Sequence, residues 1–185
     1  MTRDEIIKLV ERYPYLLPRN VFTDKLPADY AYDRILHLEI PKGWNRLFLQ
    51  MCEDIRQPLI DAKCIDSFRF TQIKEKYNRM ECYHLGAPRE VFDILEMYSA
   101  MAKYVCTRCG QPATCIAQGY LASYCKDCRR VYAKYENINR IKFEPYFKIT
   151  CISNGKRYEK IYSHQDEWIR YLESIKPPHD TIIEL

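Results

Sequence analysis

Four cysteines restrict the fold of this chain more than any other feature of its sequence. They form two CxxC pairs, Cys106 with Cys109 and Cys125 with Cys128, and fifteen residues separate the pairs. A CxxC turn brings two sulfurs to one side of a tight loop, and two such turns complete a tetrahedron of thiolates. Gly110 follows the second ligand, where such a turn tends to need a positive φ. The spacing predicts one structural Zn²⁺ held by all four cysteines.

An iron–sulfur cluster takes the same four ligands and is the alternative metal centre. A redox-active site would need one CxxC pair and not two, so the second pair favours a metal. The fifth thiol of the stretch, Cys115, lies between the pairs and is interpreted as a buried small residue. The cysteines at other spacings are expected to fill the core, and they are Cys52, Cys64, Cys82 and Cys151.

The composition is that of a globular protein. Its 185 residues are 47% hydrophobic and 29% charged, which is enough to bury a core. The first residues, MTRDEIIKLVERY, lack the apolar core of a secretory signal, and no stretch is apolar for long enough to span a membrane. We therefore expect a cytoplasmic protein, whose thiols stay reduced and serve metal binding rather than disulfides.

Hydrophobic periodicity predicts an α+β fold with a small antiparallel sheet and packed helices. Residues 68–84 alternate in character, which predicts two strands joined by a turn near Asn78. In the first strand, Phe70 and Gln72 are expected on one face and Ile73 on the other. Pro58 is expected to kink or break the helix that contains it. Helices are expected over residues 3–13, 43–64 and 88–106, and a short one over residues 129–141. The apolar stripe of the second helix is expected to be Leu47, Met51, Ile55, Leu59 and Ala62, and that of the third Val91, Leu95, Tyr98 and Ala102.

The end of the chain predicts a ββα unit. Two alternating runs flank Asn154-Gly155, the strongest short signal for a hairpin. Ser163 then begins a helical pattern, with Asp166 three residues on, as in a capping box. This unit is either an appended module or the last layer of the domain.

Three parts are expected along the chain. Residues 1–42 form an N-terminal helix and a connecting arm with four prolines after position 13. Residues 43–142 form a core domain that contains a zinc-ribbon-like module at residues 103–130. Residues 143–185 form the ββα unit.

Positive charge concentrates around the cysteine pairs. Residues 103–144 hold eight basic and three acidic residues, a net charge of +5, whereas the whole chain carries +4. An anionic partner is expected to meet this region first. Tyr132 or Tyr135 is available to stack on bases. The cations expected to contact phosphates or another partner are Arg108, Lys126, Arg129, Arg130 and Lys134.

Residues 43–128 carry three motifs in order: Gly-Trp at the start of a helix, a Lys-Glu-Lys hairpin in FRFTQIKEKYNRMECYH, and a helix that runs into the CxxC pairs. In this order they resemble a family of small, poorly characterised proteins encoded by bacteriophages and mobile elements. That family commonly has glycines in the hairpin turn, where this chain has Tyr77-Asn78-Arg79, and asparagine tolerates a left-handed backbone. The resemblance implies a phage or prophage origin and brings no known activity.

The residues favour a binding protein over an enzyme. The histidines, at positions 37, 84, 164 and 179, form no catalytic motif, and the His-rich signature of a zinc-supported nuclease is missing. A zinc site with four protein ligands has no open position for catalysis. A nuclease is therefore the least favoured of the functions considered.

We expect a non-catalytic, zinc-binding phage accessory protein in a bacterial host cell, with neither a membrane nor a small-molecule partner. It would bind and inhibit a host protein or nucleoprotein complex, as an anti-CRISPR protein does. The alternative is a DNA- or RNA-binding zinc-ribbon regulator. For a protein partner, the expected contacts are aromatic residues of the ββα unit, which would otherwise close the core, namely Tyr158, Tyr162, Trp168 and Tyr171.

Overall fold

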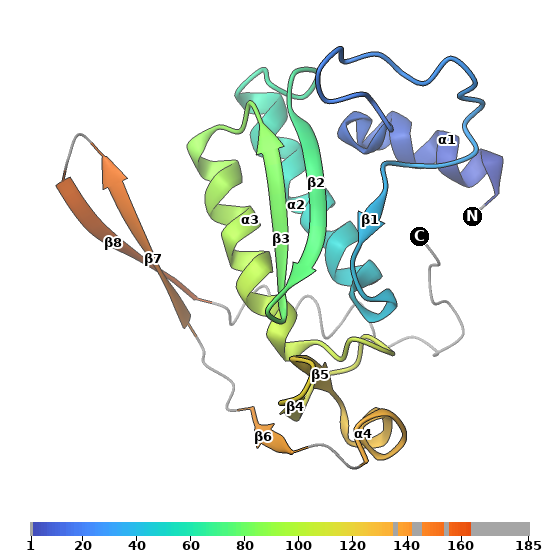
Figure 1. Ribbon diagram of the computed structural model, residues 1–185. Coiled ribbons are helices and arrows are strands. Elements are labelled where there is room, and N and C mark those ends of the chain that lie inside the picture. The colour runs from blue at the N-terminus through green and yellow to red at the C-terminus, as the bar shows by residue number, and fades with distance from the viewer. Residues whose placement is uncertain (1, 135–136, 142–145, 154–155, 164–185) are drawn as a thin grey trace.

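The computed structural model describes residues 2–134, 137–141, 146–153 and 156–163, and for the last two ranges it describes the backbone alone. Within these ranges the chain is a mixed α+β protein with four α-helices and three small sheets (Figure 1). None of the described helices combines the length and apolar character that crossing a bilayer requires.

Helix α1 (Arg3–Arg12) begins with a capping box. The Thr2 hydroxyl accepts the N–H of Glu5, and the Glu5 carboxylate accepts the N–H of Thr2. The helix ends before Pro14, as its sequence predicts. Ile6 and Val10, one turn apart, are buried in the main core.

The arm over residues 14–42 contributes to the core and to a sheet. The 3₁₀ helix η1 (Pro14–Leu16) buries Tyr15, whose hydroxyl donates to the Cys52 carbonyl at 2.6 Å. Strand β1 (Leu38–Glu39) pairs in parallel with β2 (Arg69–Lys76). The first sheet is therefore mixed rather than antiparallel as expected, because a two-residue strand leaves no alternating pattern in the sequence.

Helix α2 (Asn45–Asp61) follows the 3₁₀ helix η2 (Lys42–Trp44) and buries the predicted stripe from Leu47 to Leu59. Of the expected kink or break at Pro58, the break is wrong, because the helix runs three residues further, to Asp61. Proline removes one N–H and crowds the carbonyl four residues before it, and at this place only the last turn is affected. Ala62, expected on the apolar stripe, lies after the helix and is exposed.

Strands β2 (Arg69–Lys76) and β3 (Arg79–Leu85) form the expected hairpin. Tyr77 and Asn78 make its turn with φ of 51° and 61°, both left-handed as a tight two-residue turn requires. The expected faces of β2 are wrong in one respect. The pairing register shifts between Phe70 and Gln72, and this bulge places Ile73 in the core with Phe70.

Helix α3 (Arg89–Met101) continues into the 3₁₀ helix η3 (Ala102–Tyr104), close to the limits its periodicity predicts. Its expected stripe is confirmed, since Val91, Leu95, Tyr98 and Ala102 are all buried. Helices α2 and α3 lie together against the β2–β3 hairpin, and the chain then enters the cysteine region at one end of this core (Figure 1).

We call residues 105–134 the cysteine module, and its elements are β4 (Cys115–Ala117), β5 (Ala122–Tyr124) and α4 (Lys126–Tyr132). Strand β6 (Ile138–Arg140) follows the module and pairs with β4, so the second sheet has the order β5–β4–β6. The expected short helix over residues 129–141 is wrong in its limits, because α4 begins earlier and β6 occupies the end of that range.

Strands β7 (Tyr146–Ser153) and β8 (Lys156–Ser163) pair in an antiparallel sheet, with Ser153 opposite Lys156. This register confirms the hairpin that the Asn-Gly signal predicts. The turn itself and the helix expected after Ser163 lie outside the described residues, as do the side chains of Tyr158 and Tyr162 and the whole of Trp168 and Tyr171.

Candidate metal centre

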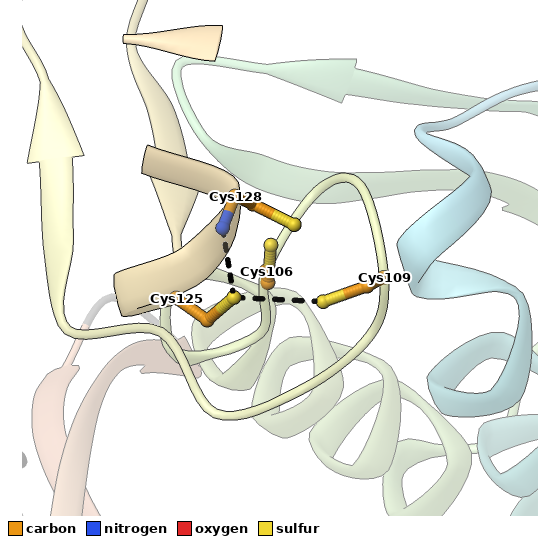
Figure 2. Close-up of side chains that lie close together, drawn as sticks. All are labelled: Cys106, Cys109, Cys125 and Cys128. Carbon is orange, nitrogen blue, oxygen red and sulfur yellow. Dashed lines mark hydrogen bonds between the residues drawn. The ribbon is translucent and has the colours of Figure 1, made fainter. Parts of the chain in front are cut away.

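Four cysteine side chains of the cysteine module point toward one another (Figure 2). Their sulfurs, from Cys106, Cys109, Cys125 and Cys128, all lie within 4.8 Å of one another. The Sγ atoms of Cys109 and Cys125 are 3.7 Å apart. A tetrahedral site with metal–sulfur bonds of about 2.3 Å has its sulfurs about 3.8 Å apart. The four thiols are therefore spaced to hold one metal ion.

The first pair lies in a tight turn. The Cys106 N–H donates to the Gln111 carbonyl at 2.8 Å, and the Gly110 N–H donates to the Cys106 carbonyl at 3.0 Å. Gly110 has a φ of 75°, which confirms the predicted need for glycine after Cys109. The turn thus directs both sulfurs to one side.

The second pair lies at the start of a helix rather than in a second loop of the same kind. Cys125 is the N-cap of α4, and its sulfur accepts the backbone N–H of Cys128 at 3.4 Å. The first helical turn brings residues three apart to the same face. Helix geometry, together with the turn at Cys106, therefore sets the positions of the four sulfurs.

Hydrogen bonds and burial shift the pKa values of these thiols when no metal is bound. A hydrogen bond from the Cys109 thiol, helped by backbone hydrogen bonds, lowers the pKa of Cys106 to about 5 although burial acts the other way. The same hydrogen bond raises the pKa of Cys109. Burial raises the pKa of Cys128 to about 12. Cys109 and Cys128 therefore hold protons at neutral pH until a metal displaces them.

Cys115 stays apart from this group. It is 2% exposed on β4, and its sulfur faces the Tyr124 carbonyl at 3.7 Å. Burial raises the pKa of its thiol. Away from the module, Cys52, Cys64 and Cys82 pack in or against the main core, whereas the side chain of Cys151 lies outside the described residues.

The Gly-Trp motif holds the first cysteine pair against α2. The Gly43 N–H donates to the Thr107 carbonyl at 3.0 Å, and a Cβ at position 43 would lie 2.1 Å from the Cys106 carbonyl oxygen. The fully buried Trp44 donates its indole N–H to the Val105 carbonyl at 3.2 Å. Only glycine allows the backbones to approach this closely.

The β2–β3 turn holds the other side of the module. The buried Asn78 side chain donates to the Ser123 hydroxyl at 2.7 Å, and Ser123 in turn donates to the Lys103 carbonyl. Glu75 accepts both the Asn78 N–H and the Tyr120 hydroxyl. These contacts were not predicted from the sequence. The one sequence feature that points to them is that the Gly-Trp motif, the hairpin and the CxxC pairs follow one another along the chain.

The cations expected to bind a partner all lie on the surface of the module. Arg108 stands over the ring of Tyr132, with its guanidinium carbon 4.4 Å from the ring centroid. Tyr132 is also exposed, whereas Tyr135 lies outside the described residues. We call the five exposed cations the cationic face, and they are Arg108, Lys126, Arg129, Arg130 and Lys134.

The histidines that the structure describes lie in different surroundings, away from the four cysteines. His37 is exposed beside Glu39, and His84 packs between Phe68 and Phe92. His164 and His179 lie outside the described residues. Over the part of the chain that the structure describes, the four cysteines are the one group of three or more metal-ligating side chains close enough to share an ion.

Comparisons with protein-family models, with curated proteins and with solved structures find no match for this chain. The function is therefore argued from the residues of the site and of the surface around it.

Proposed function

We propose that the protein is a non-catalytic nucleic-acid-binding protein, whose cysteine module is held together by one structural Zn²⁺. The observation that carries the proposal is the arrangement of charge on that module. Its four paired thiols face inward around a common point, while all five of its basic side chains are exposed. The Zn²⁺ fixes the module, and the cationic face makes the contact.

Zinc suits the donor set and its spacing. Four thiolates within 4.8 Å of one another match one tetrahedral ion, whereas a cluster of several iron and sulfide ions needs ligands that lie farther apart. With four protein ligands, the site is closed to substrate. Its role is then to supply folding energy to a module that has only a small apolar cluster of its own.

The charge balance favours an anionic partner. The cysteine module has five basic residues and one acidic residue, Asp127, a net charge of +4. A Zn²⁺ ion with four thiolates contributes −2, which leaves +2 on a short segment. Lysines and arginines on such a surface bind phosphates and release counterions from nucleic acid.

The aromatic residues expected to contact a protein partner, from Tyr158 to Tyr171, have side chains outside the described residues. The phage origin, the bacterial host cell and the inhibition of a host target therefore stay predictions. Binding to nucleic acid is the alternative function expected from the sequence, and the exposed cations of the cysteine module support it.

The test is a titration of labelled DNA and RNA with the zinc-loaded full chain at about 50 and about 200 mM salt. Affinity should fall steeply as salt rises. The double change Arg129→Glu with Arg130→Glu should abolish binding, whereas Lys8→Glu with Lys25→Glu, an equal charge reversal at exposed positions outside the module, should preserve most of it. Binding that ignores salt, or equal losses in both double variants, would contradict the proposal.

A further inference from the structure

A groove of about 640 Å³ lies beside the metal centre. One wall is the segment Glu39–Lys42 with Glu75, and the other is the cysteine module. Arg108 of the cationic face lines the groove together with Tyr120 and Tyr132. The groove is thus continuous with the surface proposed to hold phosphates.

The ring of Tyr120 is exposed to solvent, and a hydrogen bond fixes the position of the side chain. The residue is 72% exposed, and it lies in the turn between β4 and β5. Its hydroxyl donates to the Glu75 Oε2 atom at 3.2 Å, so that the polar end of the side chain is anchored to the hairpin. The ring is left available for a ligand.

Tyr132 presents a second ring to the same groove. It is 49% exposed and lies at the end of α4. Its ring is parallel to that of Tyr124, with an interplanar angle of 11° and centroids 6.5 Å apart. The Arg108 guanidinium lies over this ring, 4.4 Å from its centroid, so a base meets Tyr132 together with Arg108, whose guanidinium plane is itself a stacking surface.

We propose that this groove binds the bases of single-stranded nucleic acid, which stack on Tyr120 and Tyr132 while the cationic face holds the phosphates. The inference rests on the proposed function and names its substrate class. Exposed aromatic rings beside cations accept any unpaired base. Bases in a duplex are already stacked on each other, so their faces are closed to these rings.

The experiment compares three fluorescent probes of about 15 nucleotides: a single-stranded oligothymidine, a duplex of mixed sequence, and a polyphosphate chain without bases. The variants are Tyr120→Leu and Tyr132→Leu, with Tyr120→Phe as the variant that keeps the ring. Tyr83→Leu is the matched control. Tyr83 is also an exposed tyrosine beside a cation, Lys74, but it lies on β3 of the first sheet and outside this groove.

Single strands should bind more tightly than either other probe. Each leucine variant should lose about tenfold in affinity for the single strand with an unchanged salt slope, while Tyr83→Leu binds as the unchanged protein does. Tyr120→Phe keeps the ring but loses the hydrogen bond to Glu75, so it should lose less affinity than Tyr120→Leu. An iodouracil-substituted strand should crosslink to Tyr120 or Tyr132. Metal content and the melting temperature of each variant verify its fold.

Two results would overturn the inference and leave the proposed function standing. In the first, both leucine variants bind the single strand as tightly as the unchanged protein does, while the double change of Arg129 and Arg130 to Glu still abolishes binding. The other is tighter binding to the duplex, or to polyphosphate, than to the single strand. If no nucleic acid binds at any salt concentration, the inference and the proposed function both fail.

Discussion

At the scale of single residues, the direction of the side chain, and not its distance along the sequence, separates the four thiols of the candidate metal centre from the fifth one. Cys115 lies closer along the chain to both pairs than the pairs lie to each other, yet its side chain faces a backbone carbonyl on β4. Cys125 and Cys128 face the centre because the first turn of α4 places them on one side. The ligand set follows from local backbone geometry.

Changing one ligand should therefore remove the metal. In Cys128→Ser, elemental analysis should show the loss of the one zinc per chain, and the free energy of unfolding should fall by several kcal/mol, since metal binding energy is folding energy here. Cys115→Ser should keep one zinc per chain. A Cys128→Ser protein that retains zinc, or iron in place of zinc in the unchanged protein, would contradict the assignment.

At the scale of elements, one close backbone contact and one hydrogen bond between side chains hold the module to the core. The η2 helix meets the Cys106 turn through Gly43, and the β2–β3 turn meets β5 through Asn78. The left-handed turn at Tyr77 and Asn78 is what directs the Asn78 side chain to Ser123. The hairpin that carries the Lys-Glu-Lys motif is therefore a support for the cysteine module.

A methyl group at position 43 should break this support. In Gly43→Ala the new Cβ would lie 2.1 Å from the Cys106 carbonyl oxygen, so one backbone must move, and we expect a loss of about 2 kcal/mol or more. Urea unfolding measures it. Gly119→Ala is the control, because Gly119 is exposed with no positive φ. A neutral Gly43→Ala would show that η2 and the turn separate freely.

At the scale of the whole molecule, the cysteine module and the main core are expected to unfold as one unit. Trp44 is fully buried in the main core and donates its indole N–H to Val105, next to the first ligand. The module itself has only a small apolar cluster around its cysteines. The core therefore loses part of its packing when the module comes apart.

Removing the metal with a chelator should lower the melting temperature of the whole chain in one transition. Trp168→Phe leaves Trp44 as the sole tryptophan, so its fluorescence reports the core while circular dichroism reports all helices. The two curves should coincide and shift together. Acid should act in the same direction as chelation, because protons compete with the metal for thiols such as Cys109, whose pKa is raised.

A chelator that shifts the dichroism curve but leaves the Trp44 curve in place would show that the module and the core unfold independently. The melting curve of Trp168→Phe in excess zinc, compared with that of the unchanged protein, shows whether the substitution itself changes stability. An unchanged melting temperature after verified metal removal would instead show that metal binding contributes no folding energy.

The sequence by itself determined the features that depend on neighbours along the chain. These are the two CxxC pairs, the glycine after Cys109, the stripes of α2 and α3, and the hairpin turn at Asn78. Each is encoded by spacing, periodicity or one turn residue, and each appears in the structure close to its expected limits.

The tertiary structure alone decided how these parts fit. Asn78 and Ser123 are 45 residues apart and Trp44 and Val105 are 61 apart, and no local pattern encodes such contacts. The parallel strand β1, the bulge after Phe70 and the strand β6 likewise depend on the partner that each segment meets. The groove beside the metal centre exists for the same reason, because packing between distant segments forms its walls.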